Sequence, residues 1–539
     1  MIHNDTKSRM GPALRRGGLA MGALIASTML TPAAMAQDGT IRAVMHSSLR
    51  VMDPIETTAH ITRNHAYMIY DVLIAQDENF DPQPQMAEFE VSDDELTYTF
   101  MLRDGLMFHD GEPVTPADVI ASLERWMDKD SGGQLIAEVT ESLEAEGDDT
   151  IVWSLSKPFG PFLETVSKQS AVPPFIMPEY LVEQMEAGEV EKHIGSGPFV
   201  FNHEEFSPGE RVVYERNENY VPRDEPASWK AGGKVVNVDR VVWPSMPDAQ
   251  TAINALAAGE IDYIESINTD LLPILEAEPD VTVEVRDPLG YQTMGRLNWM
   301  HPPFDDQRIR RAALLALSQE DVLATMMGDP QYYQLCGAVF GCGTPFEHEA
   351  GAESLLEGGD PEAAQKLLEE AGYDGTPIVL MAPTDVTTLK NQPVVAAQAL
   401  RNAGFEVDMQ PMDWQSVVNR RASMDSPQDG DGWNIFFTNW QLPEIANPLI
   451  NPMLNARGGD GWFGWPDDPA LMDLRQDYIA AQTAEEQVEI AHAIQEHALE
   501  VVNYIPLGQY FPVQARRNNI EGMLQSPVVV FWGVEKTDD

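Results

Sequence analysis

Residues 102–119 read LRDGLMFHDGEPVTPADV, and this run determines the local structure on both sides of it. Just before it, residues 96–102 alternate between polar and apolar side chains, which predicts a strand. Residues 104–111 contain two glycines beside aspartates, a pattern typical of turns. Thr115 then suits the N-cap of a helix, and Pro116 suits its first turn. One face of this predicted helix carries Val119, Leu123 and Trp126.

The same alternation of strands and helices continues along the rest of the chain and predicts an α/β fold. Further strands are expected at residues 40–45, 261–264, 378–381, 405–409 and 528–532. Further helices are expected at residues 64–75, 249–258, 308–320, 361–371, 394–403 and 485–502. No Ser/Gly-rich linker divides the chain, so two lobes would be joined by ordered crossing strands rather than by a flexible tether.

The composition excludes several classes of protein. The 539 residues include 34 basic and 86 acidic ones, for a net charge of −52, and 43% are hydrophobic. That apolar fraction can bury substantial cores, so the chain is not a disordered acidic tail. A surface this acidic repels phosphate backbones and anionic headgroups, which argues against nucleic-acid and anionic-membrane partners.

Residues 1–36 have the features of a cleavable export signal. A positive segment ending in Arg15 and Arg16 precedes an apolar run at residues 17–30, and Ala-Met-Ala at residues 34–36 suits a cleavage site. We expect the Sec route rather than the twin-arginine route, because the residues flanking the arginine pair do not match the twin-arginine pattern. Removing the signal takes away four basic residues and one acidic residue, which leaves a net charge of −55. The mature protein is expected to be soluble and periplasmic.

Export also affects the interpretation of the two cysteines. Cys336 and Cys342 are separated by the five residues GAVFG, and the compartment outside the inner membrane is oxidising. We expect a disulfide, which would stabilise the fold by about 2 kcal/mol. The alternative is a pair of buried free thiols.

Motifs for covalent chemistry and metal binding are absent. The sequence contains no GxSxG, no P-loop and no GxGxxG. His203 and His348 are each followed by Glu but lack the second histidine of a zinc motif, and His492 and His497 are spaced for different faces of a helix. No catalytic residue, metal or cofactor is expected.

Large aromatic residues gather beside turns in the second half of the chain. Rigid rings at such positions provide binding contacts at low entropic cost. We expect Trp440, which lies between Asn439 and Gln441, and Trp414 to face a cleft; the alternative for Trp433 and Trp465 is a place in the core. The full group is Trp414, Trp433, Trp440, Trp462, Phe463 and Trp465.

The run at residues 102–119 resembles the signature of the family 5 extracellular solute-binding proteins, the dipeptide, oligopeptide and nickel receptors of ABC importers. The resemblance continues through GSGPF at 195–199, RNENY at 216–220, LAAGEID at 256–262 and the segment 304–316, and so covers the mature chain. CGTP at 342–345 and YIPLGQ at 504–509 are similar to a peptide-type subgroup.

The resemblance implies a two-lobed clamshell of the type II periplasmic-binding class, with an extra subdomain in lobe I. Lobe I would comprise residues 37–285 and a return at 505–539, and lobe II residues 286–504. A solute would bind between the lobes, and their closure would present a surface to the permease subunits in the inner membrane. Such a receptor is a monomer and does no covalent chemistry.

The family also suggests ligand contacts, which we transfer one by one. Peptide-binding members pair the ligand α-amino group with an acid that lies four residues before a proline, which here gives Glu444; an exposed loop position is the alternative. Counting three residues from Trp440 gives Pro443 instead, so this chain carries a one-residue insertion. The backbone of Ser48, Leu49 and Arg50 matches the segment that pairs with an extended peptide. For a ligand carboxylate the sequence offers Lys390, Arg420, Arg421 and Arg457 without choosing among them.

The expected function is therefore the substrate-binding component of an ABC importer for a peptide or peptide-like solute. A nickel chelate, haem or an opine are alternative ligands within the same class. A secreted hydrolase and a chaperone-like envelope protein are the alternatives from other classes.

Overall fold

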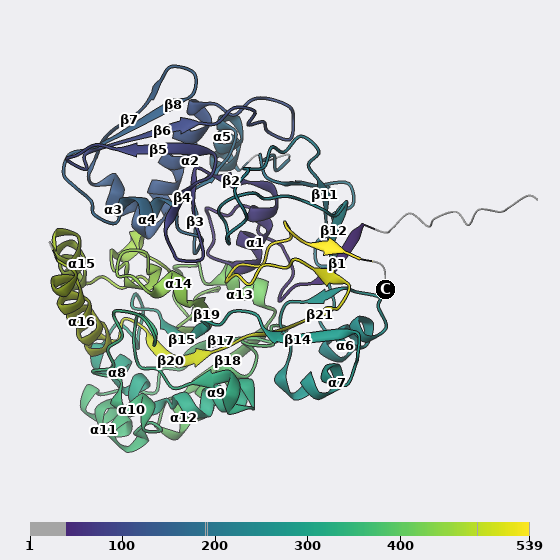
Figure 1. Cartoon of the computed structure of the whole chain (residues 1–539). Coiled ribbons are helices and arrows are strands. Elements are labelled where there is room, and N and C mark those ends of the chain that lie inside the picture. The colour runs from purple at the N-terminus through teal and green to yellow at the C-terminus, as the bar shows by residue number, and fades with distance from the viewer. Residues whose placement is uncertain (1–38, 189, 191, 429, 482, 538–539) are drawn as a thin grey trace, which may run out of the picture. The chain divides into compact units, whose positions relative to one another are not determined.

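The computed structural model describes residues 39–188, 190, 192–428, 430–481 and 483–537 (Figure 1). The predicted export signal at residues 1–36 lies outside them. Two larger sheets and one smaller one organise the described chain, and helices pack on them. Within the described ranges, none of the helices has the length and the hydropathy that crossing a bilayer requires.

A seven-stranded sheet combines strands from both ends of the chain. In spatial order they are β10 (Phe199–Phe201), β11 (Arg211–Arg216), β12 (Arg240–Pro244), β1 (Thr40–Val44), β13 (Tyr263–Ile264), β21 (Val513–Arg517) and β14 (Val281–Val285). β1 runs parallel to both of its neighbours. Near this sheet, Lys536 Nζ donates a hydrogen bond to the carbonyl oxygen of Thr40 at 3.0 Å. The start and the end of the described chain therefore lie side by side.

A six-stranded sheet is built from one continuous part of the chain. Its strands are β16 (Tyr333–Gln334), β20 (Ile505–Tyr510), β15 (Tyr291–Leu297), β19 (Ile435–Gln441), β17 (Ile378–Pro383) and β18 (Val407–Met412). β15 and β19 pair antiparallel over seven residues each, from Tyr291 opposite Gln441 to Leu297 opposite Ile435. All residues of these two strands are buried. They form the centre of this sheet.

The third sheet has four strands, and three strand pairs are shorter. The four are β5 (Ala87–Val91), β6 (Thr97–Leu102), β8 (Thr150–Leu155) and β7 (Thr140–Glu146). The pairs are β2 (Asp71–Val72) with β9 (Phe175–Ile176), β3 (Ile74–Gln76) with β4 (Pro82–Pro84), and β22 (Ile520–Glu521) with β23 (Glu535–Lys536).

Helices lie along these sheets and between them (Figure 1). The first eight are α1 (His60–Ile69), α2 (Pro116–Lys129), α3 (Ser131–Ala137), α4 (Phe162–Val166), α5 (Glu179–Ala187), α6 (Ala249–Ala257), α7 (Leu272–Glu276) and α8 (Gln307–Ala316). They are followed by α9 (Gln319–Met327), α10 (Glu353–Leu356), α11 (Pro361–Ala371), α12 (Gln392–Asn402), α13 (Trp414–Arg420), α14 (Leu442–Ile445), α15 (Pro469–Ala480) and α16 (Ala484–Val501). α2 contacts β7 and β8, whereas α9 contacts β20 and α12 contacts β17.

The signature run folds as its residues predict. β6 ends at Leu102, and α2 begins at Pro116 with Thr115 as its N-cap. The backbone N–H of Thr115 donates to Asp118 Oδ2 at 2.8 Å, which satisfies a donor at the start of the helix. Val119, Leu123 and Trp126 are each 0% exposed. The helix therefore packs by the face that the periodicity indicates.

Three predicted elements differ in the structure. The helix expected at 64–75 starts at His60 and ends at Ile69, because Tyr70 is extended and strands follow it. Apolar periodicity misplaced its ends because the helix is buried nearly all round rather than along one face. The helix expected at 308–320 is two helices, since Leu317 is extended and Ser318 starts α9 as its N-cap. The strand expected at 528–532 is a buried irregular segment, in which Lys230 Nζ binds the Val528 carbonyl oxygen at 2.9 Å.

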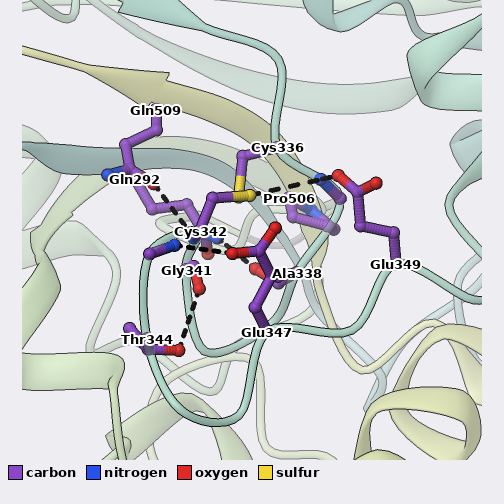
Figure 2. The surroundings of a disulfide bond; sticks show 12 residues. Gln292, Cys336, Ala338, Gly341, Cys342, Thr344, Glu347, Glu349, Pro506 and Gln509 are labelled. Atoms are coloured by element: carbon purple, nitrogen blue, oxygen red, sulfur yellow. Dashed lines mark hydrogen bonds between the residues drawn. A yellow bond between two sulfur atoms is a disulfide. The ribbon is translucent and has the colours of Figure 1, made fainter.

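The predicted disulfide is confirmed. Cys336 and Cys342 are bonded, with their Cα atoms 5.8 Å apart. Figure 2 shows Gln509 of β20 beside the loop, and its Oε1 accepts from the Cys342 backbone N–H at 3.2 Å. Gln509 Nε2 in turn donates to the Leu289 carbonyl oxygen at 2.9 Å. The disulfide loop is thereby linked to the segment that leads from β14 into β15.

Two short segments carry the chain between the seven-stranded and six-stranded sheets. Residues 286–290 lead from β14 to β15, and residues 511–512 lead from β20 back to β21. The Arg286 backbone N–H donates to the Pro512 carbonyl oxygen at 2.9 Å, so the two crossings lie side by side. Gly290 has φ +78°, and a Cβ there would lie 2.9 Å from the Tyr510 carbonyl oxygen. Only glycine fits this crossing without strain.

Candidate functional site

A cavity of about 60 Å³ lies where residues associated with the two large sheets meet. One group of lining residues comes from the first 290 positions: His46, Thr58, His60, Glu265 and Arg286. The other group comes from the six-stranded sheet and its connections: Tyr291, Thr388, Trp414, Arg421, Asn439, Trp440 and Tyr510. These residues converge from segments far apart in the chain.

A second cavity of about 100 Å³ adjoins the first. His46 and Ser266 line both, so the two share a wall. Ser48 and Leu49 line this second cavity, as do the exposed side chains of Glu210 and Asp385. The two cavities form one candidate site.

Most of the predicted ligand contacts come together here. Trp440, Asn439 and Trp414 line the first cavity, and Ser48 and Leu49 line the second. Arg50 lines neither and forms an ion pair with Asp413 at 2.9 Å. The contact roles of all these residues stay predictions. Trp433 and Trp465 are buried against each other, with ring centroids 5.8 Å apart, and line neither cavity.

Glu444 is fully buried and lines neither cavity. Its Oε2 accepts hydrogen bonds from the Gln441 backbone N–H at 2.6 Å and from His60 Nε2 at 3.0 Å. Its Oε1 accepts from Arg63 Nη1 at 3.2 Å and from the Ser170 hydroxyl. The carboxylate therefore joins α14 to α1, and its predicted role as an amine anchor stays a prediction.

The electrostatics of this group follow from burial and pairing. Burial by itself would raise the pKa of Glu444, but the hydrogen bonds from His60 and the charge of Arg63 hold that pKa below its usual value. Burial lowers the pKa of His60, so its ring is neutral at pH 7 and donates through Nε2. The positive charge that compensates Glu444 is thus carried by Arg63.

Glu265, which lines the first cavity, is also fully paired. Its Oε1 accepts from Arg286 Nη1 at 2.6 Å and from Asn64 Nδ2 at 3.3 Å. Its Oε2 accepts from the backbone N–H and the ring Nδ1 of His46, at 2.9 and 2.8 Å. Burial alone would raise the pKa of Glu265, yet His46 and Arg286 hold that pKa well below its usual range. Tyr291 accepts from Arg286 and from Gln441, which connects this group to Glu444.

Arg421 is a buried cation without a carboxylate partner among the described residues. Its side chain is 2% exposed and donates to the hydroxyls of Thr57 and Thr58 at 3.3 and 3.4 Å. The guanidinium carbon lies 4.8 Å from the ring centroid of Phe463. Burial lowers the pKa of Arg421 to about 9, which leaves it charged at pH 7.

The structure separates the four basic candidates for a ligand carboxylate. Arg421 lines the first cavity, whereas the other three line neither. Arg420 donates to Gln410 Oε1 at 2.6 Å, and Arg457 pairs with Glu138 at 2.5 Å. Spacing alone could not make this distinction, because Arg420 and Arg421 are adjacent in the sequence.

Sequence reasoning missed His46, His60, Glu265 and Arg286. Each lies close to other polar residues at or near the end of a helix or strand, and no local motif distinguishes it from them. The described residues contain no group of three or more His, Cys, Asp or Glu side chains arranged to hold a metal ion. His492 stacks on His348, and His497 binds Asp468 at 2.8 Å.

Comparison with known proteins identifies relatives along the whole chain. The probable peptide ABC transporter periplasmic-binding protein y4tO of Sinorhizobium fredii is 38% identical over 528 residues, which are 97% of this chain and 98% of that protein. The structure of the periplasmic binding protein AgaA from A. tumefacien R10 in complex with agropinic acid superposes with a TM-score of 0.77 at 20% identity, over 93% of this chain and 99% of that one.

A second solved structure is equally similar. DppA from Helicobacter pylori, in complex with the peptide STSA, has a TM-score of 0.77 at 21% identity over 92% of this chain and 98% of that one. These likenesses confirm the fold as the two-lobed α/β architecture of type II periplasmic-binding proteins. The model for "Bacterial extracellular solute-binding proteins, family 5 Middle" matches residues 81–457. The chain therefore belongs to the family 5 bacterial extracellular solute-binding proteins.

Proposed function

We propose that this protein is the periplasmic substrate-binding component of an ABC importer, and that it captures a peptide or peptide-like solute between two lobes. The observation that carries the proposal is the cavity between residues of the two large sheets. It is lined by Trp414, Trp440 and Arg421, a cation with no acidic partner among the described residues. Membership in a family of solute-binding proteins, and a 38% identical relative described as a probable peptide receptor, support it. The protein binds and releases its solute without covalent chemistry.

The two lobes of this proposal follow the sheets. Lobe I begins at residue 37 and lobe II at residue 286, as the resemblance implies. Because β20 pairs with β15 in the six-stranded sheet, we move the return to lobe I from residue 505 to the crossing at 511–512. The four-stranded sheet with α2 corresponds to the extra subdomain. Residues assigned to both lobes line the first cavity, so we expect the lobes to separate when a peptide enters.

Export and delivery complete the proposal. Cleavage after residue 36 would release the mature protein into the periplasm, where the closed monomer would dock on the permease subunits. N-terminal sequencing of the periplasmic protein should give Gln37 as its first residue. Light scattering should give the mass of one mature chain.

The test is a thermal-unfolding screen of the mature protein against di- to pentapeptides, nickel with and without chelators, haem and opines. A ligand that binds only the folded state, at a hundred times its Kd, adds about 2.7 kcal/mol of stability. We expect peptides or opine-like solutes to raise the Tm and to be recovered with unchanged mass. Stabilisation by haem or a nickel chelate alone would overturn the peptide assignment. Recovery of the peptides in hydrolysed form would overturn the assignment as a receptor.

A further inference from the structure

Among the described residues that line the first cavity, the buried side-chain atoms without a hydrogen-bond partner are all donors. Among its lining residues, Arg286 Nε, Arg421 Nε and Trp440 Nε1 are buried and have no acceptor. No side-chain oxygen of a described lining residue is buried without a donor. A buried donor without a partner is costly, so this arrangement favours a ligand that brings acceptors such as carboxylate and carbonyl oxygens.

The acids at the cavity are not available to a ligand ammonium group. Glu265 is held by Arg286 and His46, and Glu444, which lies behind the cavity wall, is held by Arg63 and His60. An ammonium that paired with either acid would leave a buried arginine uncompensated, which is strongly unfavourable. Two acids in the adjoining cavity, Asp385 and Glu210, are exposed. Asp385 accepts from the Trp414 backbone N–H at 2.7 Å, and Glu210 accepts from the Ser207 hydroxyl at 2.8 Å. Exposed acids attract ammonium groups only weakly.

The balance of charge points the same way. Arg286 and Glu265 compensate each other, and burial keeps the ring of His60 neutral. Arg421 has no acidic partner among the described residues, and its side chain is 2% exposed. Among the described residues that line the first cavity, Arg421 is thus the arginine without an acidic partner, and the acid Glu265 has a basic one.

We propose that this site selects solutes that carry a carboxylate but no free α-ammonium group, such as N-acylated peptides and N-acylated amino acids. The inference rests on the proposed function and names the substrate class of the same site. It assigns the carboxylate to Arg421 and gives Glu444 the role of holding α1 against α14. It therefore departs from the amine-anchor role that the family resemblance implies for Glu444.

The experiment compares matched forms of one ligand pool. A randomised tripeptide pool is offered to the mature protein as the free peptide, the N-acetylated acid and the C-terminal amide, together with a set of N-(carboxyalkyl) amino acids. Bound species are identified by native mass spectrometry, and their Kd values are measured by calorimetry. We expect the N-acetylated acids to bind at least as tightly as the free peptides and as the N-(carboxyalkyl) amino acids, whose secondary amine is protonated at pH 7. We expect the amides to bind at least tenfold more weakly than the corresponding acids.

Variants assign the effect to residues. Arg421→Gln should weaken binding of the best acid at least tenfold, whereas Arg420→Gln, a change at the adjacent arginine outside both cavities, should leave its Kd within twofold. Glu444→Gln should leave the ratio of Kd values for acetylated and free peptides unchanged. The unfolding transition of each variant, followed with urea, establishes that it is folded.

The outcomes separate the two proposals. Tenfold weaker binding after N-acetylation, or a selective loss of free-peptide binding in Glu444→Gln, would overturn this inference and leave the peptide receptor standing. If no form of the pool and no N-(carboxyalkyl) amino acid binds to the folded protein, the proposed function fails and this inference fails with it.

Discussion

The Glu444 carboxylate is fully buried, and its partners His60 and Arg63 come 384 and 381 positions earlier in the chain. Glu444 could be picked out from the sequence by its distance from Pro448, because counting residues along the chain requires no knowledge of the structure. It could not supply the partners, since neither residue of α1 stands in a motif. The same limit applies to Glu265 and Arg286, which meet only after two strands pair with a third.

Neutralising Glu444 should destabilise the protein. In Glu444→Gln the Arg63 guanidinium stays buried without its counter-charge, so we expect a loss of about 3 kcal/mol in the free energy of unfolding. Urea unfolding at pH 7 measures it. Glu369→Gln, on the exposed face of α11, is the matched control and should change stability by less than about 0.5 kcal/mol. Equal stabilities of the two variants would show that the Arg63 contact carries no net energy.

His109 should make stability depend on pH. Its Nδ1 accepts from the Gly195 backbone N–H at 3.3 Å, and its Nε2 donates to the Gly197 carbonyl oxygen at 3.1 Å, so the folded protein holds a neutral ring. Burial lowers the pKa of His109 from 6.5 to about 4. Between pH 6.5 and pH 4 the unfolded chain therefore binds more protons at this residue than the folded protein does. The free energy of unfolding falls as the pH falls through this range.

A variant isolates this contribution. Between pH 7 and pH 5 the unmodified protein should lose about 2 kcal/mol more than His109→Gln, which keeps a side-chain donor but cannot titrate. Urea unfolding of both proteins at the two pH values, at one ionic strength, gives the difference. A parallel loss in both proteins would show that His109 is protonated equally in the folded and unfolded states.

At the scale of elements, prediction succeeded where the capping residues coincide with the ends of the periodic stretch and failed where a capping residue lies inside it. α11 has the predicted bounds, Pro361–Ala371, because Asp360 caps it and Gly372 ends it. The helix predicted at 308–320 breaks at Leu317, because Ser318 binds the Asp321 backbone N–H and so starts a new helix. Periodicity continued across this break, so only the capping residue could have indicated it.

The crossing at Gly290 offers a test at this scale. Gly290→Ala places a methyl group against the Tyr510 carbonyl oxygen at a residue with φ +78°, so steric and backbone strain add. We expect a loss of about 3 kcal/mol in urea unfolding. Gly375→Ala is the matched control: its φ is +85° and its Cβ would have open space around it. Only the backbone cost of about 1 kcal/mol should remain there. Equal losses of unfolding free energy in the two variants would mean that the crossing shifts to accommodate the added methyl group at no further cost.

For the whole molecule, the balance of 34 basic against 86 acidic residues dominates the long-range electrostatics. The described arginines are often paired with acids, so the excess is carried by exposed Asp and Glu. Such a surface repels itself in the compact state, and dissolved ions screen that repulsion. The sequence established this property completely, because net charge does not depend on the fold.

Added salt should therefore stabilise the protein. We expect the Tm to rise by a few degrees between 0.05 and 1 M KCl, with most of the rise below about 0.3 M, where the Debye length shortens fastest. Differential scanning calorimetry measures it, and sucrose at equal osmolality is the control for solvent exclusion. A Tm that stays constant or falls with KCl would show that self-repulsion does not limit the stability of the fold.

The hydrogen bond between Lys536 and Thr40 has a consequence for engineering. Because the two ends of the described chain meet beside the same sheet, a short peptide could join them, and new ends could be opened at the exposed turn around Gly375. Such a circular permutant would keep every strand neighbour of both large sheets. A fluorescent domain could then be inserted at the old junction or at the new ends, turning the receptor into an optical reporter of its solute.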